Sequence, residues 1–542
     1  MNTLQLADYI VFIIYFLLVS GYGIYIYKKK KAATESSNDF FLAEGSLTWW
    51  AIGASLIASN ISAEHFIGMS GSGFALGLAI STYEWMAAAT LIVVAVFILP
   101  MYLKNKIYTM PQFLAKRYND TVSTIMAVIW LLVYIFVNLT SIIYLGALAI
   151  SSIAPINFEW CIAGLTIFSI IVTLGGMKVI GYTDVFQVVV LILGGLVTTY
   201  LALHLLSEQF GFGKDIFKGL AVLRKEAPGH FHMIFDKSNP HYMELPGLSV
   251  LIGGMLINNL SYWGCNQYIV QRALGADLKT ARKGILFAAF LKMLVPVIAV
   301  LPGIAMYVMH QKGMFQQEMM DAGVVKPDHA YPTLMNLLPA GLKGVAFAAL
   351  TAAIVASLAG KANSISTIFS LDIYKKYFNR EASERKLVLT GRWAVIISMV
   401  IAAIVAPALK SLDQAYQFIQ EYAGFFSPGV LAIFLLGMFW KRTTAAAGLA
   451  GALLTVPIST VLKFLPVWTN GAFPDYPFLD RMTISFFAVV LIMVVMSLMK
   501  PKSESDNHVI EMDTSLFKVS TGFIIGSFII CGMLTALYTV FW

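Results

Sequence analysis

The chain has 542 residues, of which 58% are hydrophobic and 12% are charged, and its net charge is +8. Soluble proteins carry about 25% charged residues, and the apolar runs here are long enough to cross about 30 Å of hydrocarbon, so the composition excludes a soluble enzyme or binding domain. The positive charge does not indicate a nucleic-acid partner, because the basic residues lie in short segments between apolar runs.

Apolar runs recur along the whole chain, and we interpret residues 1–542 as a single integral membrane domain made of helices. They predict about 14 membrane-spanning helices, at residues 7–27, 48–75, 79–103, 121–150, 157–177, 184–206, 246–268, 283–309, 341–374, 388–409, 413–440, 443–464, 480–499 and 516–540. The first run is interpreted as a retained helix, since no basic residue precedes it as in a secretory signal.

The charges between these runs predict an orientation. One side of the bilayer would carry Lys28–Lys31, Lys104, Lys106, Lys116, Arg117, Lys178, Arg272, Lys279, Arg282, Lys283, Lys375, Lys376, Arg380, Arg385, Lys386, Lys441, Arg442, Lys500 and Lys502. The other side would carry far fewer basic residues, mostly in two long loops. Because basic loops stay in the cytoplasm, we predict a multi-pass protein of the cytoplasmic (inner) membrane with both termini outside.

Two of the predicted spans contain stretches that suit a helix interior poorly. They are residues 58–68, ASNISAEHFIG, and residues 251–267, LIGGMLINNLSYWGCNQ. Ser, Asn and Gly favour turns, and unwound backbone at membrane depth persists only where it lines a cavity. We therefore expect unwound backbone around Asn60 and Asn259, with substrate and ion beside both breaks. Gly73 and Gly77 also have the spacing of small residues at a close helix contact, which is an alternative explanation for them.

The two stretches lie five spans apart, in the second and seventh spans. A broken leading helix in each of two five-helix halves is typical of LeuT-type transporters, which are 5+5 inverted repeats. We therefore predict an all-α membrane protein with this fold. Its parts would be a leading extra helix at 7–27, a first five-helix repeat at 48–206, a second repeat at 246–440 and three C-terminal helices at 443–540.

Several ionisable residues lie inside predicted spans, where a charge is costly unless it is paired or hydrated. Glu84 and Lys292 carry opposite charges near the middle of their spans and could form an ion pair, either structural or part of a site. Glu64 could be a satisfied structural carboxylate. Asp184 could line an ion pathway or cap a helix that begins near Thr183.

The polar side chains inside the spans suit a neutral ligand. They are His65, Glu84, Asn259, Lys292 and Gln420. Together they offer donors and acceptors with little net charge, and each hydroxyl of a polyhydroxylated ligand both donates and accepts. A carboxylate substrate would instead require an unpaired Arg or an exposed helix N-terminus. Tyr262 and Trp263 could stack on a sugar ring or could simply pack.

Segments along nearly the whole chain carry a family likeness. They are residues 50–73, WAIGASLIASNISAEHFIGMSGSG, Tyr83–Trp85, Thr183–Gln187, Tyr262–Gly264 with Gln267–Tyr268, Asn363–Ser364 through Leu371–Tyr374, and Gln417–Tyr422 followed by Ser427–Gly429. In these motifs the chain resembles the sodium/glucose cotransporters of the solute:sodium symporter family, and most closely the bacterial sodium/galactose members.

The resemblance implies which residues hold and enclose the sugar. The expected sugar ligands are Asn60, His65, Glu84, Asn259, Tyr262, Lys292 and Gln420. At His65 the bacterial galactose members carry Gln and the animal glucose members carry His. A Ser of the family is Ala87 here, so one sugar contact would be missing. The expected gates are Tyr262 and Trp263 on the inner side and Met69, Tyr83 and Tyr416 on the outer side.

The resemblance also implies a sodium site, where this chain departs from the family. The expected ligands are the backbone carbonyls of Ala58, Ile61 and Ala353 and the hydroxyl of Ser357. The family has two adjacent hydroxyls, but Ala356 replaces one of them here. Lys361 lies one helical turn after Ser357, where the galactose members have an apolar residue. Its ammonium could substitute for the cation, pair with Asp184 on the ion's cytoplasmic exit, or extend to the membrane interface.

These observations predict a secondary active symporter that works by alternating access. It would couple inward movement of a cation, expected to be Na+, to uptake of a neutral monosaccharide of the glucose/galactose class. The alternatives are a symporter for another neutral polyol such as inositol, proton-coupled or sodium-independent because of Ala356 and Lys361, and a sugar sensor that does not transport. The predicted partners are therefore the sugar, Na+ and the lipid bilayer.

Neither an enzyme nor an organic cofactor is predicted. The sequence contains no HExxH, GxSxG or paired-Cys motif that would supply a catalytic constellation. Cys161, Cys265 and Cys531 are too far apart along the chain to indicate a disulfide framework or a metal site.

Overall fold

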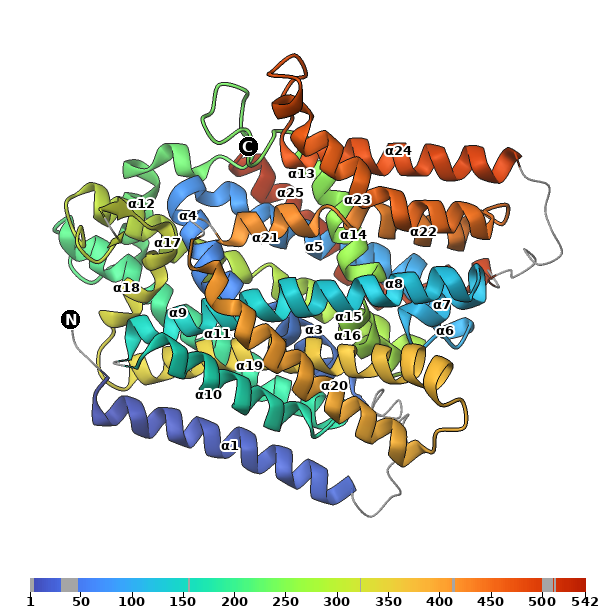
Figure 1. The fold of residues 1–542 in the computed structure, drawn as a ribbon. Helices are drawn as coiled ribbons and strands as arrows, with labels where there is room; N and C mark the ends of the chain where they lie inside the picture. Colours follow the sequence, from blue (N-terminus) through green and yellow to red (C-terminus); the bar gives the residue numbers. More distant parts are fainter. Residues whose placement is uncertain are drawn as a thin grey trace.

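The computed structural model describes residues 4–30, 47–154, 156–321, 323–411, 415–499, 510 and 513–542. Within these residues almost all regular structure is helical, and most helices run roughly along one direction (Figure 1). The strands found there are β1 (Met320–Asp321) and β2 (Val324–Val325), an antiparallel pair in which Met320 lies opposite Val325.

The first part of the chain contains the leading helix and the first predicted repeat. Its helices are α1 (Leu6–Lys30), α3 (Trp49–Asn60), η2 (Glu64–Met69), α4 (Ser70–Leu76), η3 (Gly77–Ser81), α5 (Thr82–Val93), η4 (Val94–Ile98), α6 (Leu99–Lys104), α7 (Met110–Arg117), α8 (Asp120–Val133), η5 (Tyr134–Leu139), α9 (Thr140–Ile153), α10 (Phe158–Thr173) and α11 (Met177–Gln209). A surface segment follows, with α12 (Ile216–Glu226) and η6 (Pro228–Phe231).

The second part contains the second predicted repeat and the C-terminal helices. They are α13 (Ser249–Ile252), α14 (Gly254–Cys265), α15 (Gln267–Leu274), α16 (Leu278–Lys292), α17 (Val295–Gln311), η7 (Pro327–His329), α18 (Ala330–Asn336), α19 (Leu342–Thr367), η8 (Ile368–Phe378), α20 (Glu384–Val405), η9 (Ala406–Ser411), α21 (Ala415–Ala423), α22 (Ser427–Phe439), α23 (Ala445–Trp468), α24 (Phe478–Met499), η11 (Thr514–Phe517) and α25 (Thr521–Val540).

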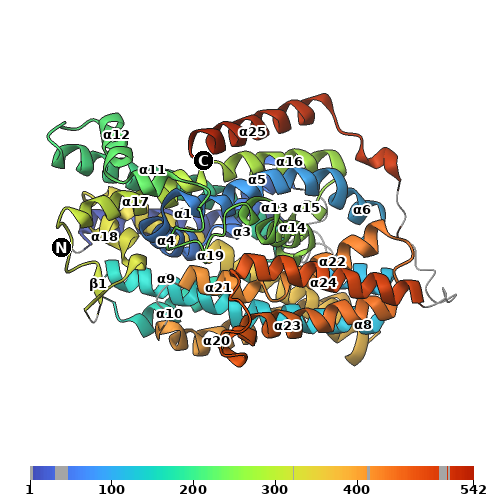
Figure 2. The same cartoon turned by 90° about the horizontal axis from the view of Figure 1, so that it is seen from above.

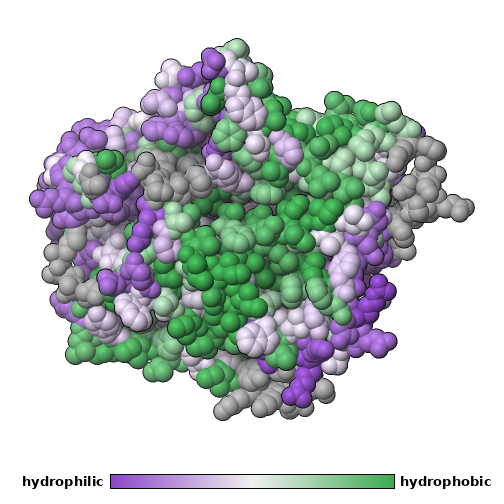
Figure 3. Space-filling view, viewed as in Figure 1, coloured by the Kyte–Doolittle hydropathy of each residue, from purple (hydrophilic) through white to green (hydrophobic). Residues whose placement is uncertain are grey.

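The helices form an apolar belt. By length and composition, 11 helices among the described residues could cross a membrane. Of the other three predicted spans, 48–75 begins with α3 and continues into the candidate span Glu64–Lys104, 157–177 is the shorter apolar helix α10, and 246–268 lies in the segment from α13 to α15. On the face shown in Figure 3, hydrophobic residues gather over the middle and hydrophilic residues toward the ends of the helices. The total of 14 spans remains a prediction.

The first predicted break is confirmed. Helix α3 ends at Asn60 because Ile61 adopts an extended conformation, with φ −72° and ψ 125°. The Ser62 hydroxyl then accepts a hydrogen bond of 3.2 Å from the backbone amide of Glu64, where the chain becomes helical again. Such local side-chain bonds compete with the helical pattern. The last carbonyls of α3 are therefore left without the amides that would continue the helix.

The second predicted break lies at a different residue from the one expected. Asn259 sits inside the continuous helix α14, and the interruptions fall at Gly253 and at Asn266, which has φ −101° and ψ 127°. The Tyr134 hydroxyl accepts a 3.1 Å hydrogen bond from the freed Gln267 backbone amide and donates to the Asn266 side-chain Oδ1. A tyrosine on η5 thus supports the break, and this partner is distant in sequence.

Glycines bring α4 and α17 into close contact. A Cβ added at Gly73 would lie 2.7 Å from the carbonyl oxygen of Val300, and one added at Gly303 would lie 2.0 Å from that of Ser70. The packing explanation of Gly73 is therefore confirmed. Gly77 also lies at a close contact, since an added Cβ would be 2.4 Å from the carbonyl oxygen of His230 in η6, and its φ of +76° at the end of α4 favours glycine.

The two described ends of the chain contact the same end of the molecule. Asp8 in α1 accepts 2.8 Å hydrogen bonds from the amides of Gly341 and Gly344 at the start of α19. The carbonyl oxygen of Phe541 accepts a 2.6 Å bond from the Met233 amide, next to η6. Figures 1 and 2 show both ends on the side that carries α12 and α18. Which side of a membrane this is remains a prediction.

The three C-terminal helices do not form one bundle. Helices α23 and α24 pack against each other and against α22, whereas α25 packs on α16 and α5. Figure 2 shows α25 on the opposite side of the molecule from α23 and α24. The two broken segments therefore lie in a core that these helices cover from two sides.

Candidate substrate and ion sites

A cavity of about 130 Å³ lies between the two interrupted segments. One water molecule needs only about 10–15 Å³ on this scale, so the space suits several waters or a small polar ligand. All seven predicted sugar ligands line it: Asn60, His65, Glu84, Asn259, Tyr262, Lys292 and Gln420. They come from α3, η2, α5, α14, α16 and α21, which the sequence places far apart.

A buried charge network forms the polar wall of this cavity. The Lys292 ammonium is 0% exposed and donates to Glu84 Oε2 and to Asn60 Oδ1. The predicted Glu84–Lys292 ion pair is therefore confirmed. Lys292 Nζ also lies 5.0 Å from the centre of the Trp263 ring, within the range of a cation–π interaction. The network anchors α3, α5 and α16 to one another.

His65 extends this network with a defined tautomer. Its Nδ1 accepts a hydrogen bond of 3.3 Å from the Ser62 amide, so that nitrogen carries no proton. Its Nε2 lies 3.3 Å from Glu84 Oε1 and can donate to it. Glu84 thus receives hydrogen bonds from Lys292 and His65 together, and the wall carries compensated charge.

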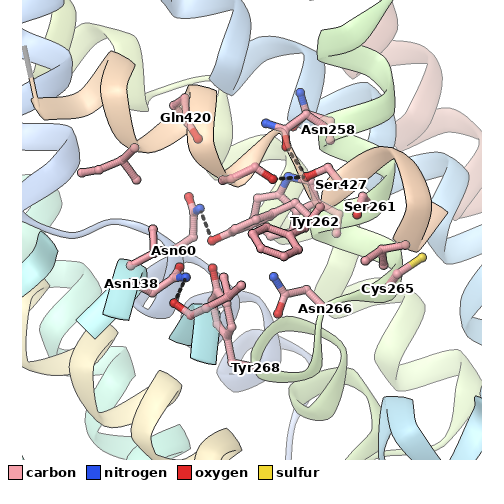
Figure 4. A pocket seen from close by; sticks show the side chains of 18 of the residues that line it. Asn60, Asn138, Asn258, Ser261, Tyr262, Cys265, Asn266, Tyr268, Gln420 and Ser427 are labelled. Atoms are coloured by element: carbon pink, nitrogen blue, oxygen red, sulfur yellow. Dashed lines mark hydrogen bonds between the residues drawn. The ribbon is translucent and has the colours of Figure 1, made fainter. Parts of the chain in front are cut away.

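Tyr262 lies at the centre of the site. Its hydroxyl accepts a 2.9 Å hydrogen bond from Asn60 Nδ2, which joins the end of α3 to α14 (Figure 4). Its ring packs edge-on against Trp263 and Tyr268, at centroid distances of 5.1 and 5.7 Å. Figure 4 shows Gln420 on one side of Tyr262 and Tyr268 on the other, as expected of a residue that divides the cavity.

The other predicted gate residues have different positions. Trp263 and Tyr83 line the cavity, and both side chains are buried. Met69 is 0% exposed in η2 and does not line the cavity in this conformation. Tyr416 lies in α21, but its side chain is outside the described part of the chain. Their roles as gates remain predictions.

Some lining residues were not predicted. Ser427 Oγ, at the start of α22, donates a 3.0 Å hydrogen bond to Asn258 Oδ1 (Figure 4). Asn138, in the span between α8 and α9, also lines the cavity. Polar residues in apolar runs were the available signal in both cases. Ala87 lines the cavity too, where the resemblance implies a missing contact.

Glu64 is a satisfied carboxylate at the edge of the same cavity. It accepts hydrogen bonds from Ser141 Oγ at 2.6 Å and from Ser62 Oγ at 3.1 Å. Ser141 belongs to α9, so this carboxylate ties the first break to the third predicted span of the first repeat. The structural explanation of Glu64 therefore holds, although the residue also borders the cavity.

The predicted sodium ligands lie between the end of α3 and the middle of α19. Ala58, Ile61, Ala353 and Ser357 are all buried, with at most 1% exposure. Ser357 Oγ donates a 3.0 Å hydrogen bond to the carbonyl of Ser59, which fixes α19 against the break. Sodium prefers oxygen ligands, and the free carbonyls at the end of α3 with one hydroxyl supply such a set.

Lys361 also reaches this position. Its Nζ donates a 2.8 Å hydrogen bond to Ser357 Oγ, and the side chain is only 2% exposed. The expectation that Lys361 extends to the membrane interface is therefore wrong. The ammonium instead lies in the core, 4.9 Å from the centre of the Tyr268 ring.

Asp184 pairs with Arg272 and not with Lys361. Arg272 Nη2 lies 3.6 Å from Asp184 Oδ2, and Ser55 Oγ donates to the same oxygen at 2.5 Å. Arg272 is 0% exposed within α15, so its expected place in a loop between spans is wrong, whereas its side of the membrane remains a prediction. Asp184 also lies inside α11, which begins at Met177, so it does not cap a helix.

Comparison with known proteins assigns the family. Residues 40–455 match the model of the Sodium:solute symporter family. The chain belongs to this family. Symporters are transporters, so the expectation of a transporter and not an enzyme is confirmed. With its long apolar helices, this symporter is a multi-pass protein of the inner membrane.

Relatives of this symporter extend over most of its length. It is 46% identical to the sodium/glucose cotransporter of Vibrio parahaemolyticus, over 99% of each chain. It is 34% identical to the human sodium/myo-inositol cotransporter 2, over 87% of this chain and 72% of that protein. A solved substrate-bound, outward-open structure of a Na+-coupled sialic acid symporter covers 92% of this chain and 99% of its own, with a TM-score of 0.77 at 21% identity. This structural likeness confirms the LeuT-type fold.

Proposed function

We propose that this symporter couples inward movement of Na+ to the uptake of a neutral monosaccharide of the glucose/galactose class. The observation that carries the proposal is the wall formed by Glu84, Lys292 and Asn60. It offers both donors and acceptors, but its charges compensate each other. Relatives named for glucose and for myo-inositol, both neutral and rich in hydroxyls, support this substrate class.

The sugar would lie against this wall. Glu84, with its two hydrogen-bond donors Lys292 and His65, presents acceptors and donors to adjacent hydroxyls, and Gln420 and Asn259 offer amides from α21 and α14. Tyr262 would close the inner side by stacking under the ring, with Trp263 behind it. Binding would replace the hydrogen bonds that Asn60 now makes with Lys292 and with Tyr262.

Coupling would run through the end of α3. The Ala58 carbonyl is an expected sodium ligand, and the Asn60 side chain, two residues later, is an expected sugar ligand. An ion that fixes this last turn of α3 against Ser357 therefore also orients Asn60. Each ligand then raises the affinity for the other by the same factor, as linkage requires. Tyr83, Met69 and Tyr416 would close the outer side once both are bound.

Uptake in proteoliposomes tests the proposal. We expect an inward Na+ gradient to drive accumulation of radiolabelled glucose or galactose. Glu84→Ala and Gln420→Ala should abolish accumulation, because each removes a direct sugar contact. Ser459→Ala is a matched control, since Ser459 bonds to Ser485 between α23 and α24, away from the cavity. Wild-type uptake by both cavity variants would contradict the site assignment.

The same assay separates the alternatives. Excess unlabelled myo-inositol that suppresses uptake more strongly than glucose would identify an inositol symporter. Accumulation driven by a proton gradient in the absence of Na+ would contradict sodium coupling. Binding of sugar without any accumulation would indicate a sensor.

A further inference from the structure

The buried ammonium of Lys361 has no exit to solvent in this conformation. It is held in α19 by the Ser357 hydroxyl at 2.8 Å and by the face of the Tyr268 ring at 4.9 Å. Ser357 Oγ in turn donates a 3.0 Å hydrogen bond to the Ser59 carbonyl. The ammonium is thus connected, through one hydroxyl, to the unwound end of α3.

Of the two adjacent hydroxyls that the resemblance implies for a coupling cation, Ser357 is the one that this chain keeps, since Ala356 replaces the other. A sodium ion bound to Ser357 Oγ would lie within a few ångströms of Lys361 Nζ. At so short a distance, and in a site shielded from water, the two positive charges repel each other strongly. The Ser357 hydroxyl can therefore accept the hydrogen bond of the ammonium or coordinate the ion, but doing both would weaken each interaction.

The local charge balance points the same way. Around the first break, the described residues include three buried or half-buried carboxylates, Glu64, Glu84 and Asp184, and three cations, Lys292, Arg272 and Lys361. Lys292 pairs with Glu84 and Arg272 with Asp184. Lys361 and Glu64 are then the remaining cation and the remaining carboxylate of this set. An added Na+ would leave this interior with an uncompensated positive charge.

We propose that the Lys361 ammonium competes with the coupling cation for Ser357, so that Na+ binds only as the ammonium withdraws. The proposal rests on the proposed function, in which Na+ is the coupling ion. It gives this symporter a built-in cation that holds α19 against α3 when Na+ is absent. It also predicts a sodium affinity lower than the same site would have without Lys361.

Sodium binding to the purified protein tests the proposal without transport. A ligand that binds the folded state stabilises it by RT ln(1 + [L]/Kd), so the rise of the melting temperature along a Na+ titration at constant ionic strength, with choline as the replacement ion, can be fitted for the half-saturating Na+ concentration. We expect Lys361→Met to lower that concentration at least tenfold. Lys343→Met should leave it unchanged: Lys343 is also buried in α19, but it bonds to the Asn336 carbonyl at 2.8 Å, away from the break.

Two further variants separate charge from shape. Lys361→Gln keeps a donor for Ser357 without the charge and should also lower the half-saturating Na+ concentration. Lys361→Arg keeps the charge and should not lower it. An unchanged or higher value for both Met and Gln variants would overturn the proposal, and the Gln variant decides if the Met variant fails to fold.

The outcome is distinguishable from a failure of the proposed function. If wild type and Lys361→Gln both take up sugar with the same half-saturating Na+ concentration, only the proposed competition between Lys361 and Na+ is contradicted. Sugar uptake by the wild type that needs no Na+ contradicts the proposed coupling itself.

Discussion

Glu84 and Lys292 each place a full charge where water is excluded, with exposures of 3% and 0%. Neither charge would be tolerated alone, because the loss of hydration exceeds what a single hydrogen bond returns. Lys292 therefore satisfies two acceptors, Glu84 and Asn60, and His65 supplies a second donor to Glu84. These contacts stabilise the ion pair, and they also position its hydrogen-bonding groups at the cavity wall.

A double-substitution cycle tests this pair. We expect Lys292→Met to lower the free energy of unfolding by about 3–5 kcal/mol, because it leaves Glu84 buried without its partner. Glu84→Gln combined with Lys292→Met should recover part of that loss, since neither charge remains, whereas sugar uptake should stay absent. Denaturation midpoints in detergent measure the stability. Strictly additive losses would contradict a direct interaction between the two side chains.

At the scale of elements, the structure around the first break depends on how closely α4 can approach α17. Gly73 and Gly303 face the other helix with no side chain between the backbones. This contact holds η2 and α4, the segment that resumes after the break, and so places His65 beside Glu84. A helix interrupted at Ile61 needs such support, because its two halves share no continuous hydrogen bonding.

Gly303→Ala is expected to destabilise the protein by about 1–3 kcal/mol and to reduce uptake, because the new methyl group overlaps the Ser70 carbonyl and forces α4 away from α17. Gly532→Ala is the matched control. Gly532 lies in α25 with nothing within 4 Å of an added Cβ, so its substitution should be neutral or slightly stabilising. Thermal unfolding of both variants measures the difference. Equal effects of the two substitutions would rule out close packing as the role of Gly303.

At the scale of the whole molecule, polar segments lie at two opposite ends of an apolar belt (Figure 3). The end with α12 and α18 also receives the first and last described helices, through the contacts of Asp8 and Phe541. The basic segments predicted to be cytoplasmic include the one that follows η8, at the opposite end (Figure 1). Orientation and coupling are linked, because inward transport requires the outer gate to open on the side without these basic loops.

Labelling of introduced cysteines in intact cells tests this orientation. In a Cys531→Ser background, where the remaining Cys161 and Cys265 are buried, Ser238→Cys in the segment before α13 should react with a membrane-impermeant maleimide added outside. Ser383→Cys, just before α20, should react only after the cells are permeabilised. Both serines are exposed, so accessibility to the reagent is matched apart from the side of the membrane. The reverse labelling pattern would place both termini inside.

The sequence alone determined much of this protein. The length of an apolar run determines whether the segment can span the membrane, and the Ser, Asn and Gly residues clustered near Asn60 interrupt one span. Both effects act between neighbouring residues, so the sequence contains them. The opposite charges of Glu84 and Lys292 predicted their pairing, since few partners exist inside an apolar core. The Ser357–Lys361 contact is also local, one turn along α19.

Only the tertiary structure decided the rest. The sequence offered Lys361 as a cation for Asp184, but the packing of α15 against α3 brought Arg272 to it. The second break lies at Asn266 and not at Asn259 because Tyr134, from a distant helix, supports the freed backbone there. Whether Lys361 would reach the membrane interface depended on how α3 and α15 cover α19. Such choices depend on which faces of separate helices meet, and a pattern along one chain does not contain that information.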